Sequence, residues 1–547
     1  MRLHSRITFK PLTSSQVVLF PQNIGERIAD NHPVRLVNEV VNGLNIDNIL
    51  GIYKGGGTSS FSPRMMIKVL FYSYLSNVYS CRKIEKALTE NIYFMWLSGN
   101  SVPDFRTINY FRSKNLKGKI QKLFADVVRL LQELNYVSLD IQYIDGTKIE
   151  SASGRYTFVW KGTVEKNKEK LEQKIQSVLE DIESQIKTDA QELNAEQTPR
   201  AINSDELRNS LSVLNEKLKD SSKATKKQLE KLQQEHLPRL EKYEQQLDTL
   251  GERNSYSKTD EDATFMRLKD DHMNNGQLKP AYNTQISTEE QFITHYSIHQ
   301  TPGDTTTLQQ HLDSFEKAYH TQSKDVVADA GYGSEENYEM MAAKGIDAYV
   351  KYNYFHKEQK RSQINNPFLP QNLHHNIEND YYVCPMGQHL EKKGEGKRVS
   401  SNGYESKVSY YEAKNCEGCP MRGMCHKSKG NRRLEVNHRL NELKANAREL
   451  LKSELGKAHR SKRPIEVEAV FGQLKSNNKF TRFTLRGLEK VDIEFGLMAL
   501  GHNFRKMAKK ALEKKQNAQE TSKKSRNGHF SYLYEAFTPS LTMPRAA

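Results

Sequence analysis

The spacing of hydrophobic residues divides the chain into a helical part and a part that contains strands. Up to residue 135, apolar side chains recur at helical spacing, as in HPVRLVNEVVNGL and SPRMMIKVLFYSYLSNVYSCRKIEKAL, with KGGGTSS as a break between them. From Val137 onward, VSLDIQYIDGTKI, PAYNTQIST and QFITHYSIH are rich in β-forming residues. The pattern predicts an all-α N-terminal domain followed by an α/β region.

Helices and strands alternate in this second part. A helix is expected in TTTLQQHLDSFEKAY, a buried strand in DVVADAGYG, a helix in EENYEMMAAKG and a strand in IDAYVKY. RYTFVW adds a short extra strand. Without residues 151–280, the predicted order is strand, strand, strand, helix, strand, helix, strand. This order resembles that of a ribonuclease-H-like mixed sheet, in which the first and fourth strands are neighbours.

A long charged segment interrupts these strands between residues 161 and 255. Its apolar residues step by three and four positions, which is the spacing of a coiled-coil seam on an otherwise polar helix. The residues of the seam are Leu171, Ile175, Val178, Ile182, Leu207, Leu211, Leu214 and Leu218, continued less regularly by Leu229, Leu232, Leu240 and Leu247. We predict an antiparallel coiled-coil hairpin; the alternative is a solvated, partly disordered arm.

The composition favours a polyanionic partner. The 547 residues include 82 Lys and Arg against 67 Asp and Glu, and the net charge of +15 favours nucleic acid over a merely solvated basic surface. No apolar run is long enough to span a bilayer, and the N-terminus lacks the apolar core of a signal peptide. Five cysteines, four of them clustered, do not resemble a disulfide framework. We therefore expect a cytoplasmic protein with no membrane partner.

Two acids stand where predicted strands end. Asp145 comes before a glycine, and Asp329 lies between the apolar run VVA and Gly-Tyr-Gly. Carboxylates at adjacent strand ends repel each other unless a cation lies between them, and Mg²⁺ (or Mn²⁺) prefers such ligands together with substrate phosphates. Two such ions about 4 Å apart activate a water or 3′-hydroxyl and stabilise the leaving oxygen of a phosphodiester. Asp140 is the alternative first acid, but a position inside a strand and no following glycine disfavour it.

A third acid is expected in HRSKRPIEVEAVFGQLKSNNKFTRFTLRGLEKV. A helix from about Ile465 places apolar residues on one buried stripe, and Glu468 flanks that stripe. Glu466 is a weaker alternative because it is turned about 200° from Glu468 on the helix. Glu468 is otherwise an ordinary surface glutamate. The buried stripe consists of Val467, Val470, Phe471 and Leu474. The basic residues that follow, Lys475, Lys479, Arg482, Arg486 and Lys490, indicate that a polyphosphate chain is held beside the acid.

Other basic residues are candidates for contacts with DNA. The segment NSVPDFRTINYFRSKNL resembles part of a helix-turn-helix, in which Arg106 and Arg112 reach phosphates or bases; a helical bundle with surface arginines fits equally well. The loop DATFMRLKDDHMNNGQLKPAYN either follows a DNA backbone or is an ordinary solvated loop. Its basic residues are Arg267, Lys269, His272 and Lys279.

A cysteine cluster precedes the third acid. The segments YYVCPMGQHL and NCEGCPMRGMC supply Cys384, Cys416, Cys419 and Cys425. Four thiols that include a C-x2-C pair suffice for a tetrahedral structural Zn²⁺ site, which we favour over free thiols. His426 is an alternative ligand to Cys425. Cys81, on an N-terminal helix, is expected to be a packed thiol.

These motifs together resemble those of a bacterial insertion-sequence transposase of the DDE class. The resemblance covers the helical N-terminal domain, YIDGTKIES, NNGQLKPAYNTQI, VVADAGYGSEENY and VEAVFGQLKSN. It implies Asp145, Asp329 and Glu468 as the metal-binding, catalytic acids, and Arg463 with Lys475 as the basic residues around the glutamate. His459 stands where the family often has a tyrosine. Four residues instead of the commoner three separate Arg463 from Glu468, which leaves the role of Arg463 open.

The resemblance implies a DNA transposase that binds the ends of its element and catalyses metal-dependent cleavage and strand transfer. Its partners are the terminal inverted repeats and target DNA, and a homodimer on DNA in the bacterial cytoplasm, associated with the nucleoid, is expected. The alternatives are a ribonuclease-H-like nuclease without strand transfer and a catalytically silent, transposase-derived DNA-binding protein. The candidate DNA-binding residues are Arg106, Arg112, Lys279, Arg463, Lys475, Lys479 and Arg482.

The predicted architecture has five parts. They are a helical DNA-binding domain (1–135), a ribonuclease-H-like catalytic core (136–160, 256–355 and 456–515), a coiled-coil hairpin (161–255), a zinc-ribbon-like cysteine-rich insertion (356–455) and a basic C-terminal tail (516–547).

Overall fold

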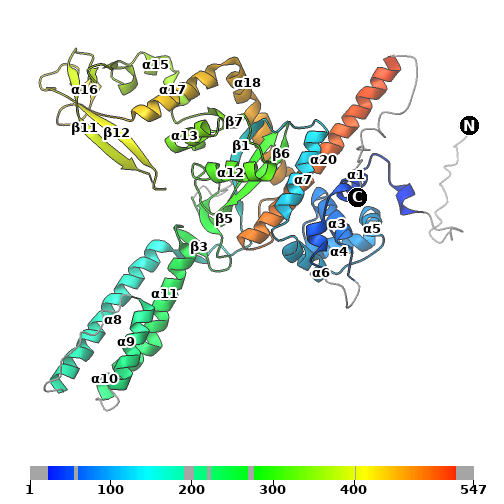
Figure 1. The fold of residues 1–547 in the computed structure, drawn as a ribbon, viewed down its shortest axis with the longest axis horizontal. Coiled ribbons are helices and arrows are strands. Elements are labelled where there is room, and N and C mark those ends of the chain that lie inside the picture. Colours follow the sequence, from blue (N-terminus) through cyan, green and yellow to red (C-terminus); the bar gives the residue numbers. More distant parts are fainter. Residues whose placement is uncertain are drawn as a thin grey trace, which may run out of the picture. The chain divides into compact units, whose positions relative to one another are not determined.

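The computed structural model describes residues 23–53, 60–189, 203–217, 223–268, 276–400 and 402–524. They form two compact units: one contains the described residues up to Asn115 and from Phe504 onward, and the other contains Leu116–Asn503. The chain is of the mixed α/β class with a helical N-terminal region, as predicted (Figure 1). The finer domain boundaries stay a prediction, although helix α7 (Ile120–Glu133) falls in the second unit and not with the N-terminal helices.

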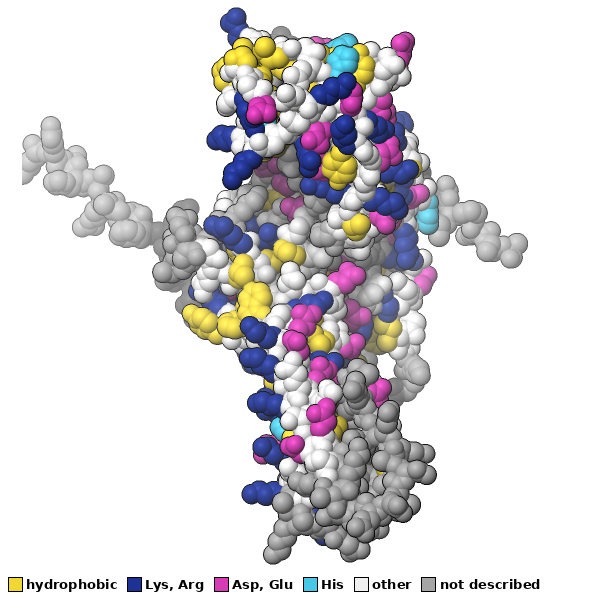
Figure 2. Space-filling model, turned by 90° about the vertical axis from the view of Figure 1, so that its left-hand side faces the viewer, with side chains coloured by type: hydrophobic (Ala, Val, Ile, Leu, Met, Phe, Trp, Pro, Cys, Tyr) yellow, Lys and Arg dark blue, Asp and Glu magenta, His cyan; other side chains and the backbone are white. Residues whose placement is uncertain are grey.

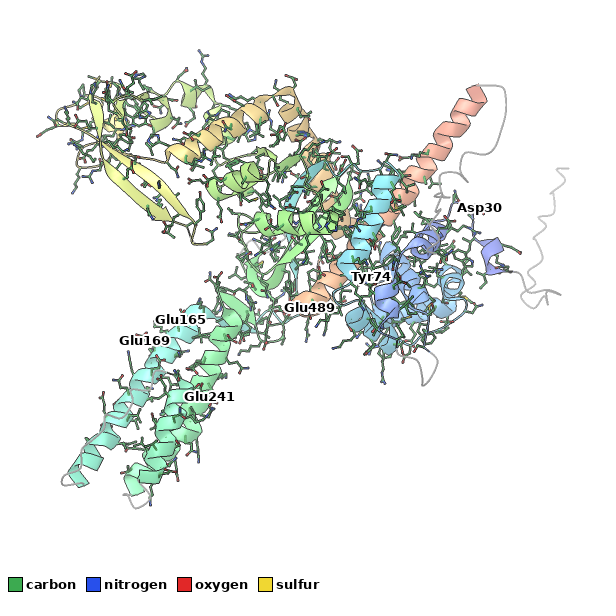
Figure 3. The ribbon with its side chains drawn as sticks, in the orientation of Figure 1. Asp30, Tyr74, Glu165, Glu169, Glu241 and Glu489 are labelled. Atoms are coloured by element: carbon green, nitrogen blue, oxygen red, sulfur yellow. The ribbon has the colours of Figure 1, made fainter. Side chains whose placement is uncertain are left out.

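The first unit consists of short helices that begin at recognisable capping residues. Pro33 and Pro63 open α1 and α3, where the fixed φ of proline suits the first helical turn. Asp104 caps α6 by accepting a hydrogen bond of 2.7 Å from the Thr107 N–H. Tyr74, on α3, is fully buried (Figure 3). The elements are η1 (Ile24–Arg27), α1 (Pro33–Gly43), α2 (Asp47–Leu50), α3 (Pro63–Leu75), α4 (Cys81–Glu90), α5 (Ile92–Ser98), α6 (Phe105–Tyr110), η2 (Phe111–Asn115) and the end of α20 (Leu488–Lys524).

A mixed sheet forms the core of the second unit. Its strands are β1 (Ile141–Glu150), β4 (Thr264–Arg267), β5 (Leu278–Glu289), β6 (Phe292–His299), β7 (Asp325–Ala328) and β8 (Asp347–Val350). Their order is β4-β5-β1-β7-β8, and β6 also pairs with β5. β1, β7 and β8 run parallel, whereas β5 is antiparallel to β1, β4 and β6. The predicted pairing of the first and fourth core strands, β1 and β7, is confirmed.

Helices pack against this sheet and bury its central strands. α12 (Leu308–Tyr319) contacts β6, α13 (Glu335–Ala343) and α17 (His438–Lys452) contact β8, and α18 (Glu454–Arg463) contacts β7. Parallel strands covered in this way read as continuous apolar runs. Accordingly, Val326, Val327 and Ala328 of β7 are at most 1% exposed.

The segment between β2 (Phe158–Trp160) and β3 (Ser255–Ser257) is helical, and these two strands pair with each other at its base. Its elements are α8 (Lys161–Asp189), α9 (Ser204–Lys217), α10 (Lys223–Lys231), η3 (Leu232–His236) and α11 (Leu237–Leu250). A further helix packs within the predicted hairpin: α9 packs on α11, which packs on α8, and leucines of all three helices share one core. Arg208 of α9 also pairs with Glu241 of α11; Figure 3 labels Glu241. Leu218, predicted in the seam, lies outside the described residues.

The cysteine-bearing insertion contains an antiparallel sheet of five strands. Its strand order is β13-β12-β11-β10-β9, and the register of the β11–β12 hairpin shifts between Lys392 and Gly394. Its elements are α14 (Phe355–Glu358), α15 (Arg361–Ile364), η5 (Pro370–Asn372), β9 (His374–Asn376), β10 (Tyr381–Val383), β11 (His389–Val399), β12 (Glu405–Ala413), α16 (Arg422–Cys425) and β13 (Arg433–Val436).

The C-terminal region is helical further than predicted. We expected a solvated tail from residue 516, but α20 continues to Lys524, and residues 525–547 lie outside the described part. None of the helices that the structure describes has the length and apolar character needed to cross a membrane.

Candidate active site

The paired strands β1 and β7 bring two of the predicted acids to neighbouring positions. Tyr143 of β1 faces Val327 of β7 in the parallel register. Asp145 follows Tyr143 by two residues, and Asp329 follows Val327 by two residues. The two acids therefore occupy corresponding positions along neighbouring segments of the sheet. The Asp145 side chain is 17% exposed and that of Asp329 is 54% exposed, with a Lys351 ammonium 3.9 Å from Asp329.

Arg463 joins Asp145 to the third predicted acid, Glu468. One guanidinium nitrogen lies 3.2 Å from Asp145 Oδ2, and the other donates to Glu468 Oε1 at 2.9 Å. The Arg463 side chain is only 6% exposed, whereas that of Glu468 is 54% exposed. Two acids that are far apart in the sequence therefore share one buried cation.

Glu468 stands on a helix whose buried stripe matches the prediction. η6 (Pro464–Glu468), α19 (Ala469–Gly472) and η7 (Gln473–Asn477) continue α18 without a break. The stripe residues Val467, Val470, Phe471 and Leu474 are at most 8% exposed. The stripe fixes the helix against the sheet and leaves Glu468 on the partly exposed side.

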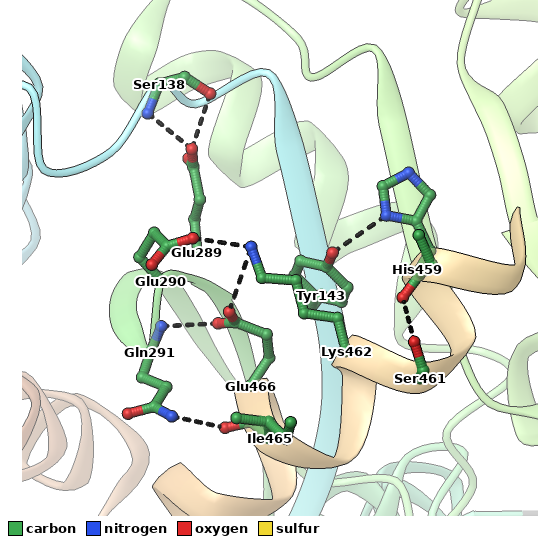
Figure 4. Close-up of polar contacts among 11 residues, drawn as sticks. Ser138, Tyr143, Glu289, Glu290, Gln291, His459, Ser461, Lys462, Ile465 and Glu466 are labelled. Atoms are coloured by element: carbon green, nitrogen blue, oxygen red, sulfur yellow. Dashed lines mark hydrogen bonds and ion pairs between the residues drawn. The ribbon is translucent and has the colours of Figure 1, made fainter. Parts of the chain in front are cut away.

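Glu466 points to the opposite side and has a structural role. Its side chain is 2% exposed and accepts a hydrogen bond of 2.6 Å from the Gln291 N–H in the β5–β6 turn (Figure 4). Lys462 pairs with Glu466 at 3.8 Å and with Glu290 of the same turn at 2.7 Å (Figure 4). The turn residues Glu290 and Gln291 both have positive φ. These contacts anchor the helix that carries Glu468 to the β5–β6 hairpin.

His459, which stands where the family often has a tyrosine, lies beneath the sheet edge. Its Nδ1 is 3.0 Å from the Tyr143 hydroxyl, and its Nε2 is 3.7 Å from Asp325 (Figure 4 shows the contact with Tyr143). Burial lowers the pKa of His459. It packs α18 against β1 and β7, which is a structural contact.

Asp304 is an acid near this site that the sequence reasoning missed. Its Oδ1 accepts hydrogen bonds from the side-chain amides of Asn283 at 2.8 Å and Gln285 at 3.0 Å. Burial, followed by the charges of Asp304 and Asp145, raises the pKa of Tyr332, which places both acids near the same phenol. The signal available in the sequence was the turn Pro-Gly-Asp after a strand, which parallels the Asp-Gly at Asp145.

The glycine after Asp145 is required by this neighbourhood. A Cβ atom on Gly146 would lie 2.3 Å from Gln285 Nε2 and 2.8 Å from Asp304 Oδ1. Gly146 therefore allows β5 and the Asp304 turn to approach Asp145 closely.

Asp140, the alternative first acid, lies elsewhere. It comes just before β1 and not inside a strand, it is exposed, and it pairs with Lys324 at 3.2 Å. Asp145 lies within β1, five residues further along the chain.

The basic residues after Glu468 mostly contact the chain around the end of β1. Lys475 donates to the Lys148 carbonyl at 3.2 Å. Arg482 donates to the Ser151 and Ser153 carbonyls, both at 2.9 Å, and Lys279 pairs with Glu150 at 3.5 Å. Lys479 is exposed and has a positive φ of 55°.

One predicted DNA contact is wrong. Arg112 is 4% exposed, and its guanidinium donates to the Tyr74 hydroxyl at 3.1 Å and the Tyr79 carbonyl at 2.9 Å. It ties together helices of the N-terminal unit and does not face solvent. Arg106, by contrast, is exposed. Of the predicted DNA-tracking loop, Lys269 and His272 lie outside the described residues.

The clustered cysteines line a common cavity together with Arg432 and His426. The Arg432 N–H is 3.4 Å from Cys416 Sγ, and its guanidinium is 3.0 Å from Cys425 Sγ. Within the described chain, these sulfurs do not form a group of three whose ligand atoms all lie within 4.8 Å. The cysteines that border the cavity are Cys384, Cys416, Cys419 and Cys425. Cys81, outside this cluster, is buried as predicted.

Comparison with protein families agrees with the resemblance seen in the sequence. A family model described as "Transposase DDE domain" matches residues 383–508, and one described as "Transposase domain (DUF772)" matches residues 22–114. No curated protein matches the chain. The first match includes the cysteine cluster, Arg463, Glu468 and Lys475, and the second covers most of the N-terminal helices.

Proposed function

Since these matches support an insertion-sequence DDE transposase, a nucleotidyl-transferase-type enzyme that acts on DNA, we propose that the chain binds the ends of its element, cleaves there and joins the 3′-hydroxyls to target DNA. Asp145, Asp329 and Glu468 are the proposed catalytic and metal-binding acids. The observation that carries this proposal is the buried Arg463, which binds Asp145 and Glu468 together.

The strand order supports a ribonuclease-H-like core. Along the sheet, β6, β5 and β1 are successive antiparallel strands, and β7 and β8 follow in parallel on the other side of β1. In an α/β sheet, ligands bind where strands end and their order reverses. Asp329 directly follows β7 at that reversal, whereas Asp145, which we expected at a strand end, lies within β1, five residues before its end.

The donor set fits Mg²⁺ or Mn²⁺. Carboxylate oxygens are the ligands these ions prefer, and the half-exposed Asp329 and Glu468 leave room for water and phosphate. Bound ions of this kind activate a water or 3′-hydroxyl and stabilise the leaving oxygen. Arg463 balances the charge of Asp145 and Glu468 and links the two side chains, although the carboxylates of Asp145, Asp329 and Glu468 in the described chain do not all lie within 4.8 Å of one another. Because Arg463 is buried and bound to both acids, we propose it as a positioning residue and not as a DNA contact.

The DNA is proposed to follow basic residues beside these acids and on the N-terminal unit. Lys475 lies two helical turns after Glu468 and is proposed to hold a phosphate, which would compete with its hydrogen bond to the Lys148 carbonyl. Exposed Lys479 and Arg106 are further candidates, whereas Arg482 and Lys279 are partly engaged by the chain itself. Along one edge of the helical insertion, Lys and Arg side chains form a row next to acidic ones (Figure 2). Because two ends must be joined, we propose a homodimer on DNA.

Structural Zn²⁺ at the four cysteines remains part of the proposal. The cysteines share a cavity, and N–H groups of Gln388 and Arg432 donate to Cys384 Sγ and Cys416 Sγ. The sulfurs must come closer together to surround one ion, since zinc–sulfur bonds are about 2.3 Å long. Zinc content of the purified protein, compared with Cys416→Ser/Cys419→Ser, tests this assignment.

A strand-transfer assay tests the proposed function. Uncleaved element ends with Mg²⁺ are used to measure cleavage, and pre-cleaved ends with target DNA and Mg²⁺ are used to measure joining, for the wild type, Asp329→Asn and Asp140→Asn. We expect Asp329→Asn to lose cleavage and joining by at least about 10³-fold, a loss typical of removing one essential charge-stabilising group. Asp140→Asn, which removes an exposed carboxylate of the same region, should be as active as the wild type.

The outcomes separate the alternatives. Cleavage without joined product indicates a nuclease. DNA binding with no cleavage by the wild type indicates a catalytically silent DNA-binding protein. Full activity of Asp329→Asn contradicts the proposed site.

A further inference from the structure

Two histidines and an aspartate meet in the cysteine-bearing insertion, apart from the cysteine cavity. His375 is on β9, Asp380 lies in the β9–β10 turn, and His438 is the first residue of α17. In the part of the chain that the structure describes, they are the single group of three His, Cys, Asp or Glu residues whose ligand atoms all lie within 4.8 Å. His375 Nε2 is 3.2 Å from Asp380 Oδ1.

Surrounding aromatic residues hold this group in place. The His375 ring stacks on Tyr382 with centroids 4.3 Å apart, and on the His438 ring at 5.3 Å. The Tyr411 hydroxyl lies 2.6 Å from Asp380 Oδ1 and 2.8 Å from His438 Nε2. All three candidate ligands are partly buried. The imidazole nitrogens and one carboxylate oxygen are thus gathered around a single point.

Lys392 is the group that competes for Asp380. Its ammonium lies 2.9 Å from Asp380 Oδ2 and 2.7 Å from Glu395 Oε1. Because it contacts Oδ2, the other oxygen of Asp380 remains directed toward His375 and Tyr411. The register of the β11–β12 pair shifts directly after Lys392, and such bulges commonly redirect the side chains beside them.

We propose that His375, Asp380 and His438 bind a divalent transition-metal ion such as Zn²⁺, with the Tyr411 oxygen or a water as fourth ligand. Two imidazoles and one carboxylate suit Zn²⁺ better than Mg²⁺, which prefers oxygen ligands alone. Ligands about 2.0–2.1 Å from a tetrahedral ion lie roughly 3.3 Å apart, close to the 3.2 Å between His375 Nε2 and Asp380 Oδ1, and all three ligand atoms lie within 4.8 Å of one another. The ion would fasten the edge strand β9 to the start of α17, which contacts β8 of the central sheet.

Cobalt(II) is a probe that distinguishes this site from the cysteines. The full chain carrying Cys416→Ser and Cys419→Ser is stripped with EDTA and titrated with Co²⁺. Beyond any Co²⁺ held by Asp145, Asp329 and Glu468, we expect one Co²⁺ that gives the strong visible d–d absorption of a four-coordinate site, without the near-ultraviolet thiolate charge-transfer band that sulfur ligands give; this absorption is the measure of binding at the new site. The ion should also raise the melting temperature as its concentration increases.

Two further variants test the ligands. His438→Gln in the same background keeps a group able to hydrogen-bond Tyr411 but removes the imidazole, so Co²⁺ binding should be lost while circular dichroism is unchanged. If that variant does not fold, His375→Gln is measured instead. Lys392→Met removes the competing cation and should tighten Co²⁺ binding roughly tenfold, since a like charge within a few ångströms opposes a cation.

Three results would overturn the proposal: no Co²⁺ binding in the double-serine background, unchanged binding in a folded histidine variant, or no gain of affinity in Lys392→Met. Each would show that the group is a hydrogen-bonded network of the sheet and nothing more. None of these readouts depends on transposition, so the proposed function and this site fail separately.

Discussion

Replacing Arg463 by glutamine should destabilise the catalytic unit more in EDTA than in the presence of a divalent ion. Arg463 is 6% exposed and pairs with Asp145, which is 17% exposed. Removing one partner of a buried pair costs about 3–5 kcal/mol, because the other charge stays buried and uncompensated. Glu468 is 54% exposed. The second pair therefore adds at most ~1 kcal/mol.

A divalent ion that binds Asp145 and Glu468 supplies the missing positive charge. At a free Mn²⁺ concentration of 100 times the dissociation constant, binding contributes about 2.7 kcal/mol, so Arg463→Gln should regain a large part of its loss. Chemical denaturation with and without Mn²⁺ measures both values.

Lys457→Gln is the matched control on the same helix. Lys457 pairs with Glu454, and both side chains are more than half exposed. Its loss should be below about 1 kcal/mol and independent of Mn²⁺. A loss for Arg463→Gln that is equally small, or that Mn²⁺ does not change, refutes the claim that Asp145 and Glu468 share a cation site.

Three other substitutions have expected outcomes. Glu466→Gln, which weakens the buried contact with the Gln291 N–H, should cost ~1–3 kcal/mol in urea denaturation but leave Mn²⁺ affinity unchanged. Gly146→Ala should lower the melting temperature and cost ~1–3 kcal/mol, because the new methyl would meet Gln285 at 2.3 Å. Burial raises the pKa of Asp492 to about 6. The protonated Asp492 side chain therefore contributes its full stabilisation of the folded state below the unfolded pKa near 4. This contribution to the free energy of unfolding is lost as the pH rises through about 6. Asp492→Asn should remove about 2–3 kcal/mol of this pH dependence. Each explanation has a contradicting result. For Asp492→Asn it is a free energy of unfolding that still falls between about pH 4 and 6. For Gly146→Ala it is wild-type stability, and for Glu466→Gln it is a changed Mn²⁺ affinity.

The central sheet was predictable because its strands obey local rules. The buried run of β7 and the β5–β6 hairpin carry continuous or alternating apolar residues, and the strand–helix order restricted the topology. The orientation of Glu468 against Glu466 also followed from helical periodicity alone. The apolar stripe determines which side of that helix is buried.

Features that depend on tertiary contacts were not predictable. Arg112 lies in η2, and only the positions of Tyr74 and Tyr79 show that its guanidinium is buried. Asp304 belongs to a Pro-Gly-Asp turn that resembles the Asp-Gly at Asp145, but only the pairing of β5 with β1 brings it near that acid. Local sequence does not determine such long-range contacts.

The helical insertion shows the same limit. Its heptad spacing identified the leucines that become buried. The spacing within one helix does not determine how many helices pack around the common core. The short α9 has the same leucine spacing as the longer helices. It packs on α11 and is the third helix that contributes leucines to the core.

The most direct test of the central claim is the position of Mn²⁺ in crystals of the protein with element-end DNA, located by anomalous scattering. We expect Mn²⁺ within about 2.5 Å of carboxylate oxygens of Asp145, Asp329 and Glu468. Mn²⁺ bound without any one of these acids, or bound elsewhere while the DNA end occupies the enzyme, would contradict it.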